Sequence, residues 1–390
     1  MRATFSLSRV YQRASLFAAR ESVKNKAFNV DPQAQRLVSL DAFRGFVMLC
    51  IIGDYAVVRG LESLKGYPIA AIVVRQLTHS PWRGLRFEDV IWPSFMLMVG
   101  VSAVFSYAKR SKTQTNQQMM WAVAKRAAIL FILGSVRESV ALGAPALIER
   151  SSALQSIALA SVVCFLLAPR SWRTQALVGG IILGGHALLL AFVPAPGIPP
   201  GSYQKGANLV YAVDMAVLGR VYTEGWGTVL AEIPAVATSI IGMLIGGLLK
   251  STSVANKHRA IAAIGVACLA IGWSLGAFIP VIMKMWTASY GLVSAGWACL
   301  LFLLFYFIFD ELGLQKWSFP LVVVGMNAIT IYMLGESDTL ISFPKIVDIY
   351  TKRLASGMGS FGLLFQALAI LTVEWLVLYW MYKRKIFLKA

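Results

Sequence analysis

Apolar runs separated by short polar segments fill most of the chain. Ten such runs are centred near residues 49, 98, 131, 160, 183, 240, 270, 298, 327 and 373. A helix of about 20 apolar residues, rising 1.5 Å per residue, crosses the roughly 30 Å hydrocarbon core of a bilayer. The pattern therefore predicts an all-α fold, a polytopic bundle of about ten (ten or eleven) transmembrane helices.

Composition supports a membrane protein and narrows its chemistry. The 390 residues are 58% hydrophobic and 14% charged, which is more apolar surface than one soluble core of this length can bury. The four cysteines all lie within apolar runs and form no CxxC pair, so neither a disulfide framework nor a metal site is expected. The net charge of +18 fits cytoplasmic loops of a lipid-embedded protein better than a nucleic-acid partner.

The distribution of basic residues predicts the orientation of the bundle. With ten spans and the N-terminus inside, the inner segments carry 22 Lys and Arg and the outer segments carry 13. Because cytoplasmic loops are enriched in Lys and Arg, both termini are predicted to be cytoplasmic. Residues 60–87 are then outside.

Two regions are distinguished along the chain. Residues 1–36 are rich in Arg and Ser, as in a transit peptide, but a basic cytoplasmic extension close to lipid headgroups is the preferred interpretation. Residues 37–390 form one transmembrane domain. Its longer outer segments, 194–230 and 337–362, are too short for separate domains.

Ionisable residues gather near the outer ends of the first two spans. Asp54 lies about 20 Å beyond Asp41 along the first helix, at the level of the loop with His79 and of Asp89 at the start of the second span. An imidazole with carboxylates beside it is a general-base arrangement. The alternative is that His79 is an interface residue and Asp89 a helix N-cap.

The inner side offers cationic groups at which a phosphorylated cytosolic metabolite could bind: Arg44, Lys109, Arg110, Lys125 and Arg126. The positive-inside rule alone also explains them. Gln155 and Asn327 are polar at membrane depth, where they either line a polar path or hydrogen-bond a neighbouring helix. The chain has no GxxxxGK[ST] phosphate loop, GxSxG elbow, HExxH or Rossmann GxGxxG motif.

Four segments together resemble a known family. The stretches "RLVSLDAFRGFVML", "THSPWRGLRFEDVIWPSFMLMVGVS", "LAEIPAVATSIIGMLIG" and "FPLVVVGMNAITIYML" are similar, in this order, to signature segments of the heparan-α-glucosaminide N-acetyltransferase-like family of membrane acyltransferases, in a bacterial version. The resemblance implies that an acetyl group passes from cytosolic acetyl-CoA to an amino sugar on the far side of the membrane.

The resemblance also implies site residues. Its H-x-x-W-x-G segment corresponds to His79, Trp82 and Gly84, with Asp89 at the following helix start. Asp54 stands where the family usually has asparagine. "NLVYAVDMAVLGR" is similar to the family's N-x5-D segment and adds Asn208 and Asp214, while an altered turn, "EGWGTVLAEIP", leaves Glu224 or Glu232 as the acidic residue.

The expected protein is thus an acetyl-CoA-dependent N-acetyltransferase of the bacterial inner membrane. His79 is either a general base or the site of an acetyl-imidazole intermediate. The inner cations hold the CoA phosphates, and Gln155 or Asn327 donates to the thioester oxygen. A permease for a sugar or lipid-linked sugar is the main rival, followed by a non-catalytic membrane partner. The oligomeric state is open, and a homodimer is compatible with the sequence.

Overall fold

The computed structural model describes residues 37–149, 153–221, 224–335 and 342–387, except for the side chains of residues 54, 55, 334 and 335. This part of the chain is almost entirely helical. Its only paired strands are β1 (Tyr203–Gln204) and β2 (Ala207–Asn208), which form a small antiparallel hairpin. The all-α class is confirmed, and the extension at 1–36 lies outside the described residues.

The long helices coincide with the predicted runs. They are α2 (Val38–Glu62), α4 (Ile91–Arg110), α5 (Asn116–Leu142), α6 (Ala153–Leu167), α7 (Trp172–Phe192), α9 (Glu232–Lys250), α10 (Lys257–Leu275), α11 (Ala288–Tyr306) and α15 (Gly362–Lys383). The run centred near residue 327 is instead two short helices, α12 (Phe319–Met326) and α13 (Ala328–Gly335), separated by Asn327. The remaining short helices are α3 (Pro68–Gln76), α8 (Leu209–Leu218) and α14 (Phe343–Gly357). The short turns are η1 (Glu88–Val90), η2 (Met283–Met285), η3 (Phe307–Glu311), η4 (Gln315–Ser318) and η5 (Gly359–Phe361).

Seven helices of the described residues are long and apolar enough to cross a bilayer. They correspond to α4 with η1, α5, α7, α9, α10, α11 with the turn that follows it, and α15 with the turn before it. The chain is therefore a helical membrane protein. Three predicted spans fall outside this set: α2, which carries several charged residues, α6, with 15 residues, and the broken pair α12 and α13.

Glycines allow the central helices to touch backbone to backbone. A Cβ added to Gly100 of α4 would lie 1.7 Å from the Ser239 carbonyl oxygen of α9, and one on Gly242 would lie 2.0 Å from the Leu97 carbonyl oxygen. Small residues at such crossings are the usual route to close packing in membranes, where apolar side chains gain nothing by leaving lipid. The α4–α9 contact consequently fixes α4 in the middle of the bundle.

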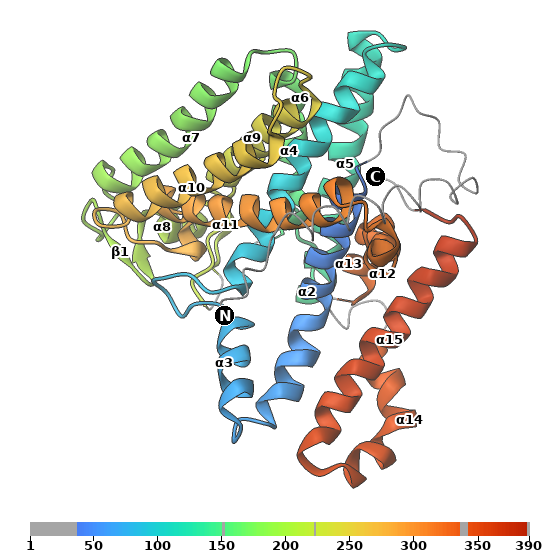
Figure 1. Ribbon diagram of the computed structural model, residues 1–390. Coiled ribbons are helices and arrows are strands. Elements are labelled where there is room, and N and C mark those ends of the chain that lie inside the picture. The colour runs from blue at the N-terminus through green and yellow to red at the C-terminus, as the bar shows by residue number, and fades with distance from the viewer. Residues whose placement is uncertain (1–36, 150–152, 222–223, 336–341, 388–390) are drawn as a thin grey trace, which may run out of the picture.

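Helix α2 is capped at its first residues and lies between two groups of helices. The Asp310 carboxylate accepts hydrogen bonds from the Val38 and Ser39 amides at 3.2 and 3.3 Å, which satisfies free N–H groups at the start of the helix. In Figure 1, α2 runs through the centre, with α7, α9, α10 and α11 on one side and α14 and α15 on the other. This arrangement leaves one face of α2 and one face of α4 directed towards α5, α6 and α13.

Candidate functional site

His79 is held by a buried carboxylate. It lies in the irregular segment between α3 and η1, and its Nδ1 is 3.0 Å from Oδ1 of Asp89, a fully buried residue of η1. Asp89 also accepts from the backbone amides of Ser80, at 3.3 Å, and Arg86, at 2.8 Å. A backbone amide can only donate, so both of these amide contacts use the Asp89 carboxylate as an acceptor.

The Asp89 contact determines which imidazole nitrogen can react. Because an ionised carboxylate only accepts hydrogen bonds, Nδ1 of His79 carries the proton and donates it to Asp89. The lone pair is then on Nε2. His79 lines the large cavity described below and is about one-third exposed, so its ring is accessible while Asp89 lies behind it.

Three further side chains surround the His79 ring. The Trp226 ring lies edge-on to it at 4.9 Å, and the Lys284 ammonium is 5.2 Å from the centre of the Trp226 ring. Glu224 pairs with Lys284 at 3.4 Å and accepts from Nε1 of Trp226 at 3.3 Å. The Trp226 hydrogen bond, aided by the Lys284 charge, lowers the pKa of Glu224 from its ordinary value. This end of the cavity therefore presents an imidazole, an aromatic face and an ionised carboxylate.

A single cavity of about 870 Å³ begins at this group and follows α4. Ten α4 residues line it at helical spacing: Ile91, Trp92, Phe95, Met98, Val99, Ser102, Ala103, Ser106, Tyr107 and Arg110. From the first to the last of them the helix rises about 28 Å at 1.5 Å per residue. The cavity thus extends along nearly the full thickness of a bilayer core.

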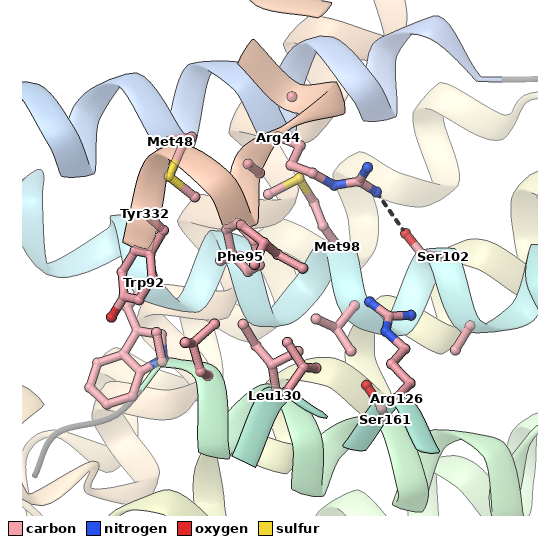
Figure 2. Close-up of a pocket in the computed structure, with 18 of the residues that line it drawn as sticks. Arg44, Met48, Trp92, Phe95, Met98, Ser102, Arg126, Leu130, Ser161 and Tyr332 are labelled. Carbon is pink, nitrogen blue, oxygen red and sulfur yellow. Dashed lines mark hydrogen bonds between the residues drawn. The ribbon is translucent and has the colours of Figure 1, made fainter. Parts of the chain in front are cut away.

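The other end of the cavity is cationic. Arg44 of α2, Arg110 of α4 and Arg126 of α5 all line it. Arg44 is 3.4 Å from the Asp41 carboxylate and donates to the Ser102 hydroxyl at 3.3 Å. Figure 2 shows Arg44, Ser102 and Arg126 gathered at one end of the pocket, with Trp92 and Tyr332 towards the other. Guanidinium groups in this arrangement can bind phosphates by paired hydrogen bonds.

Other predicted residues lie around the His79 end rather than on the cavity wall. Trp82 donates its indole N–H to the Tyr203 carbonyl at 2.8 Å, which ties the His79 segment to the β hairpin. Asn208 caps α8 through the Tyr211 amide, and buried Asp214 accepts from the Thr228 and Val229 amides at 2.8 and 2.9 Å. These contacts shape the loops above the cavity.

The structure separates the two candidate acidic residues of the altered turn. Glu224 lines the cavity beside His79, whereas Glu232 lies in the first turn of α9 and is not among the described residues that line it. Asp54 falls in the C-terminal half of α2, but its side chain lies outside the described part of the structure. Its proposed partnership with His79 therefore stays a prediction.

Gln155 and Asn327 were predicted to donate to the thioester oxygen. Both instead form hydrogen bonds with backbone groups. The Gln155 amide donates to the Leu147 carbonyl at 3.0 Å and accepts from the Glu149 amide at 3.1 Å. Asn327 is fully buried and donates to the Ile386 carbonyl at 3.1 Å. Neither Gln155 nor Asn327 is among the described residues that line the cavity. Lys125, which is exposed, does not line it either.

Several cavity residues with charged, hydroxyl or indole groups were not predicted from the sequence. Glu88, Arg137, Trp226 and Tyr332 line the cavity, and Lys284 borders it. Arg137 and Lys284 interrupt apolar stretches of the sequence, and the cost of placing a charge at membrane depth is the signal that could have identified them. The described residues contain no cluster of three or more His, Cys, Asp or Glu that could hold a metal ion.

Neither a model of a known protein family nor a curated protein sequence matches the chain. The likeness to membrane acyltransferases therefore stays a prediction carried by the four segments quoted above. What the chain does has to be argued from the geometry of its cavity.

Proposed function

We propose that this protein is a transmembrane acetyltransferase that uses cytosolic acetyl-CoA to acetylate an amino sugar on the outer side of the membrane. One observation carries the proposal: the same cavity joins three guanidinium groups at one end to His79 at the other. A donor with an anionic head and a reactive thioester at the end of a long arm fits such a cavity. A small diffusible acyl donor would need no such length.

In this reaction, Arg44, Arg110 and Arg126 bind the donor phosphates, and the pantetheine arm lies along the apolar face of α4. The thioester then reaches His79. Nε2 of His79 takes a proton from the acceptor amine as its nitrogen attacks the acyl carbon, and Asp89 stabilises the imidazolium that forms. The imidazolium next gives this proton to the departing thiolate. The alternative, in which Nε2 itself is acetylated first, uses the same groups.

The ionised Glu224 supports an amine rather than a hydroxyl as the acceptor. Glu224 lies beside His79, and its partners Lys284 and Trp226 both contact Oε2, so Oε1 is the oxygen that would accept a hydrogen bond from an acceptor ammonium group. The acceptor's amine can be held there until one proton is lost to solvent. The free amine is then within reach of His79.

The proposal includes ten spans with both termini in the cytoplasm of a bacterial inner membrane. Its support is the 22 to 13 distribution of basic residues and the helices found at nine of the ten predicted centres. In that orientation the arginine end of the cavity faces acetyl-CoA in the cytosol. His79 faces the compartment that contains the glycan.

The deciding experiment uses proteoliposomes that contain labelled acetyl-CoA in the lumen and a panel of amino sugars outside, or the reverse. Acetylated sugar should form across the membrane only when acetyl-CoA is on the arginine side. A permease would instead move unmodified sugar and leave acetyl-CoA intact. Protein with His79→Ala is the control, and labelled product at the wild-type rate with that variant would contradict the proposed chemistry.

A further inference from the structure

A charged pair lies in the wall of the cavity at membrane depth. Arg137 of α5 and Tyr332 of α13 both line the cavity. Nη1 of Arg137 donates to the Tyr332 hydroxyl at 2.8 Å, and the guanidinium carbon is 4.7 Å from the centre of the tyrosine ring. Placing an arginine within a membrane span costs free energy, so such a residue usually has an ion-pair partner and a functional role.

The partner is Glu149. Its Oε1 accepts from Nη1 of Arg137 at 2.5 Å, and its side chain is only 2% exposed. Glu149 is not among the described residues that line the cavity, whereas Arg137 is. The Arg137 guanidinium therefore faces the cavity, whereas the Glu149 carboxylate lies behind the cavity wall.

The segment that carries Glu149 is built to hold this position. Gln155 fixes the Glu149 amide and the Leu147 carbonyl, and the Ser139 hydroxyl accepts from the Ala146 amide at 2.9 Å. Gly134 provides the space, because a Cβ there would lie 2.7 Å from Oε2 of Glu149. The chain thus folds back after α5 to place one carboxylate against one guanidinium.

Helix geometry places the pair close to the His79 end. Arg137 is eleven residues beyond Arg126 on α5, and Trp92 is ten residues from Ser102 on the antiparallel α4. Both steps correspond to about 15 to 17 Å away from the cationic end. Figure 2 shows Tyr332 and Trp92 towards the same end of the pocket, and Trp92 is three residues from Asp89, the partner of His79. The pair therefore lies at the depth where the thioester would react.

We propose that Arg137 and Tyr332 form the site that binds the acyl carbonyl oxygen and stabilises the oxyanion. The inference rests on the proposed acyl transfer. When the acceptor nitrogen, or Nε2 of His79, bonds to the acyl carbon, the C=O electron pair moves onto oxygen. The Tyr332 hydroxyl, polarised by Arg137, donates to that oxygen. The electron pair on the oxygen then re-forms the C=O bond, the C–S bond breaks, and the thiolate takes up the proton from His79 as it leaves.

The sign of the charge distinguishes this role from a purely structural one. A buried ion pair that only joins helices gains nothing from a position on a cavity wall. Here the cation faces the cavity, which favours a group that becomes negative during the reaction and disfavours the ammonium form of the acceptor. Preorganised donors of this kind act mainly on the transition state.

Tyr332→Phe tests the inference because it keeps the ring and removes only the hydroxyl. We expect kcat to fall by about 10²-fold, the usual loss for one oxyanion donor, while the inhibition constant of free CoA changes less than twofold. Free CoA has the phosphates that bind at the arginine end but no acyl oxygen. Tyr350→Phe, on exposed α14, is the matched control and should retain wild-type kinetics.

The outcomes separate this inference from the proposed function. If wild-type protein transfers acetyl groups and Tyr332→Phe keeps kcat within twofold, the oxyanion assignment is wrong and the function stands. A parallel loss of kcat and CoA affinity would also overturn it, since that result indicates a role in shaping the cavity. Absence of transfer by wild-type protein to every acceptor would refute the function itself.

Discussion

At the scale of single residues, the proposed chemistry depends on the hydrogen bond between His79 and Asp89. The bond fixes the imidazole tautomer and leaves Nε2 free towards the cavity. Asp89 is also held by two backbone amides, so the carboxylate can move little. His79 is consequently a positioned imidazole rather than a loosely attached surface histidine.

The first prediction concerns this pair. His79→Ala should lower kcat by roughly 10² to 10⁴, the usual contribution of a positioned acid or base. Asp89→Asn should lower it by a similar amount, because an amide that donates to Nδ1 favours the unreactive tautomer. Both are measured by acetyl transfer at saturating donor. Unchanged turnover in either variant, with a normal thermal unfolding profile, would remove that residue from the mechanism.

The second prediction compares Arg126 with its neighbour Lys125 as binding residues for acetyl-CoA. They are neighbours on α5, yet among the described residues only Arg126 lines the cavity. Arg126→Ala should raise KM for acetyl-CoA about tenfold or more, since a charged hydrogen bond contributes about 1.5 to 3 kcal/mol, with little change in KM for the acceptor. Lys125→Ala should leave both values unchanged. Equal effects of the two variants would indicate general surface charge rather than a binding site.

Residue types at marked positions made part of the site predictable. His79 and the inner arginines stand out because polar and charged groups are costly beside apolar runs. The hydrogen-bond partners of Gln155 and Asn327 could not be predicted, since a polar residue at membrane depth serves a cavity or a neighbouring backbone equally well. Trp226 and Tyr332 carry no charge, and only the fold brings them to the cavity.

At the scale of elements, α4 organises the molecule. One face of α4 packs on α9 through glycines, and another forms the cavity wall over its whole length. Helical spacing predicted the helix itself, but it could not reveal that one face borders a cavity, because cavity-facing and lipid-facing positions are both apolar. The break of the ninth run at Asn327 and the short helices α3, α8 and α14 were likewise outside the prediction.

The third prediction tests the glycine contact. Gly100→Ala places a methyl group against the backbone of Ser239, which cannot rotate away as a side chain can. Overpacking of this kind costs about 1 to 3 kcal/mol or more, so the midpoint of thermal unfolding in detergent should fall. Gly184→Ala in α7 is the control, because no atom lies within 4 Å of the added Cβ. Equal stability of the two variants would show that α4 and α9 are not in close contact.

At the scale of the whole molecule, the proposed function requires that the two ends of the cavity face different compartments. The fourth prediction is therefore topological. In a background without the four native cysteines, Arg83→Cys and Ala255→Cys place thiols at exposed positions near the His79 end and in the α9–α10 loop. An impermeant maleimide added to intact cells should label only the first. Labelling of position 255 alone would invert the orientation and place His79 in the cytosol.

The two-ended cavity also decides how the reaction relates to the membrane voltage. In the proposed reaction the phosphates of the donor stay at the arginine end, one acyl group (formally CH3CO⁺) moves outward from sulfur to nitrogen, and one proton moves inward from nitrogen to sulfur. These two formal charges cancel, so a complete turnover transfers no net charge. The energy stored in the thioester is sufficient, and no ion gradient is consumed. In proteoliposomes, a potassium diffusion potential set with valinomycin should leave the acetylation rate unchanged. A carrier of a protonated amino sugar would respond strongly, since each charge moved through 100 mV is worth about 2.3 kcal/mol.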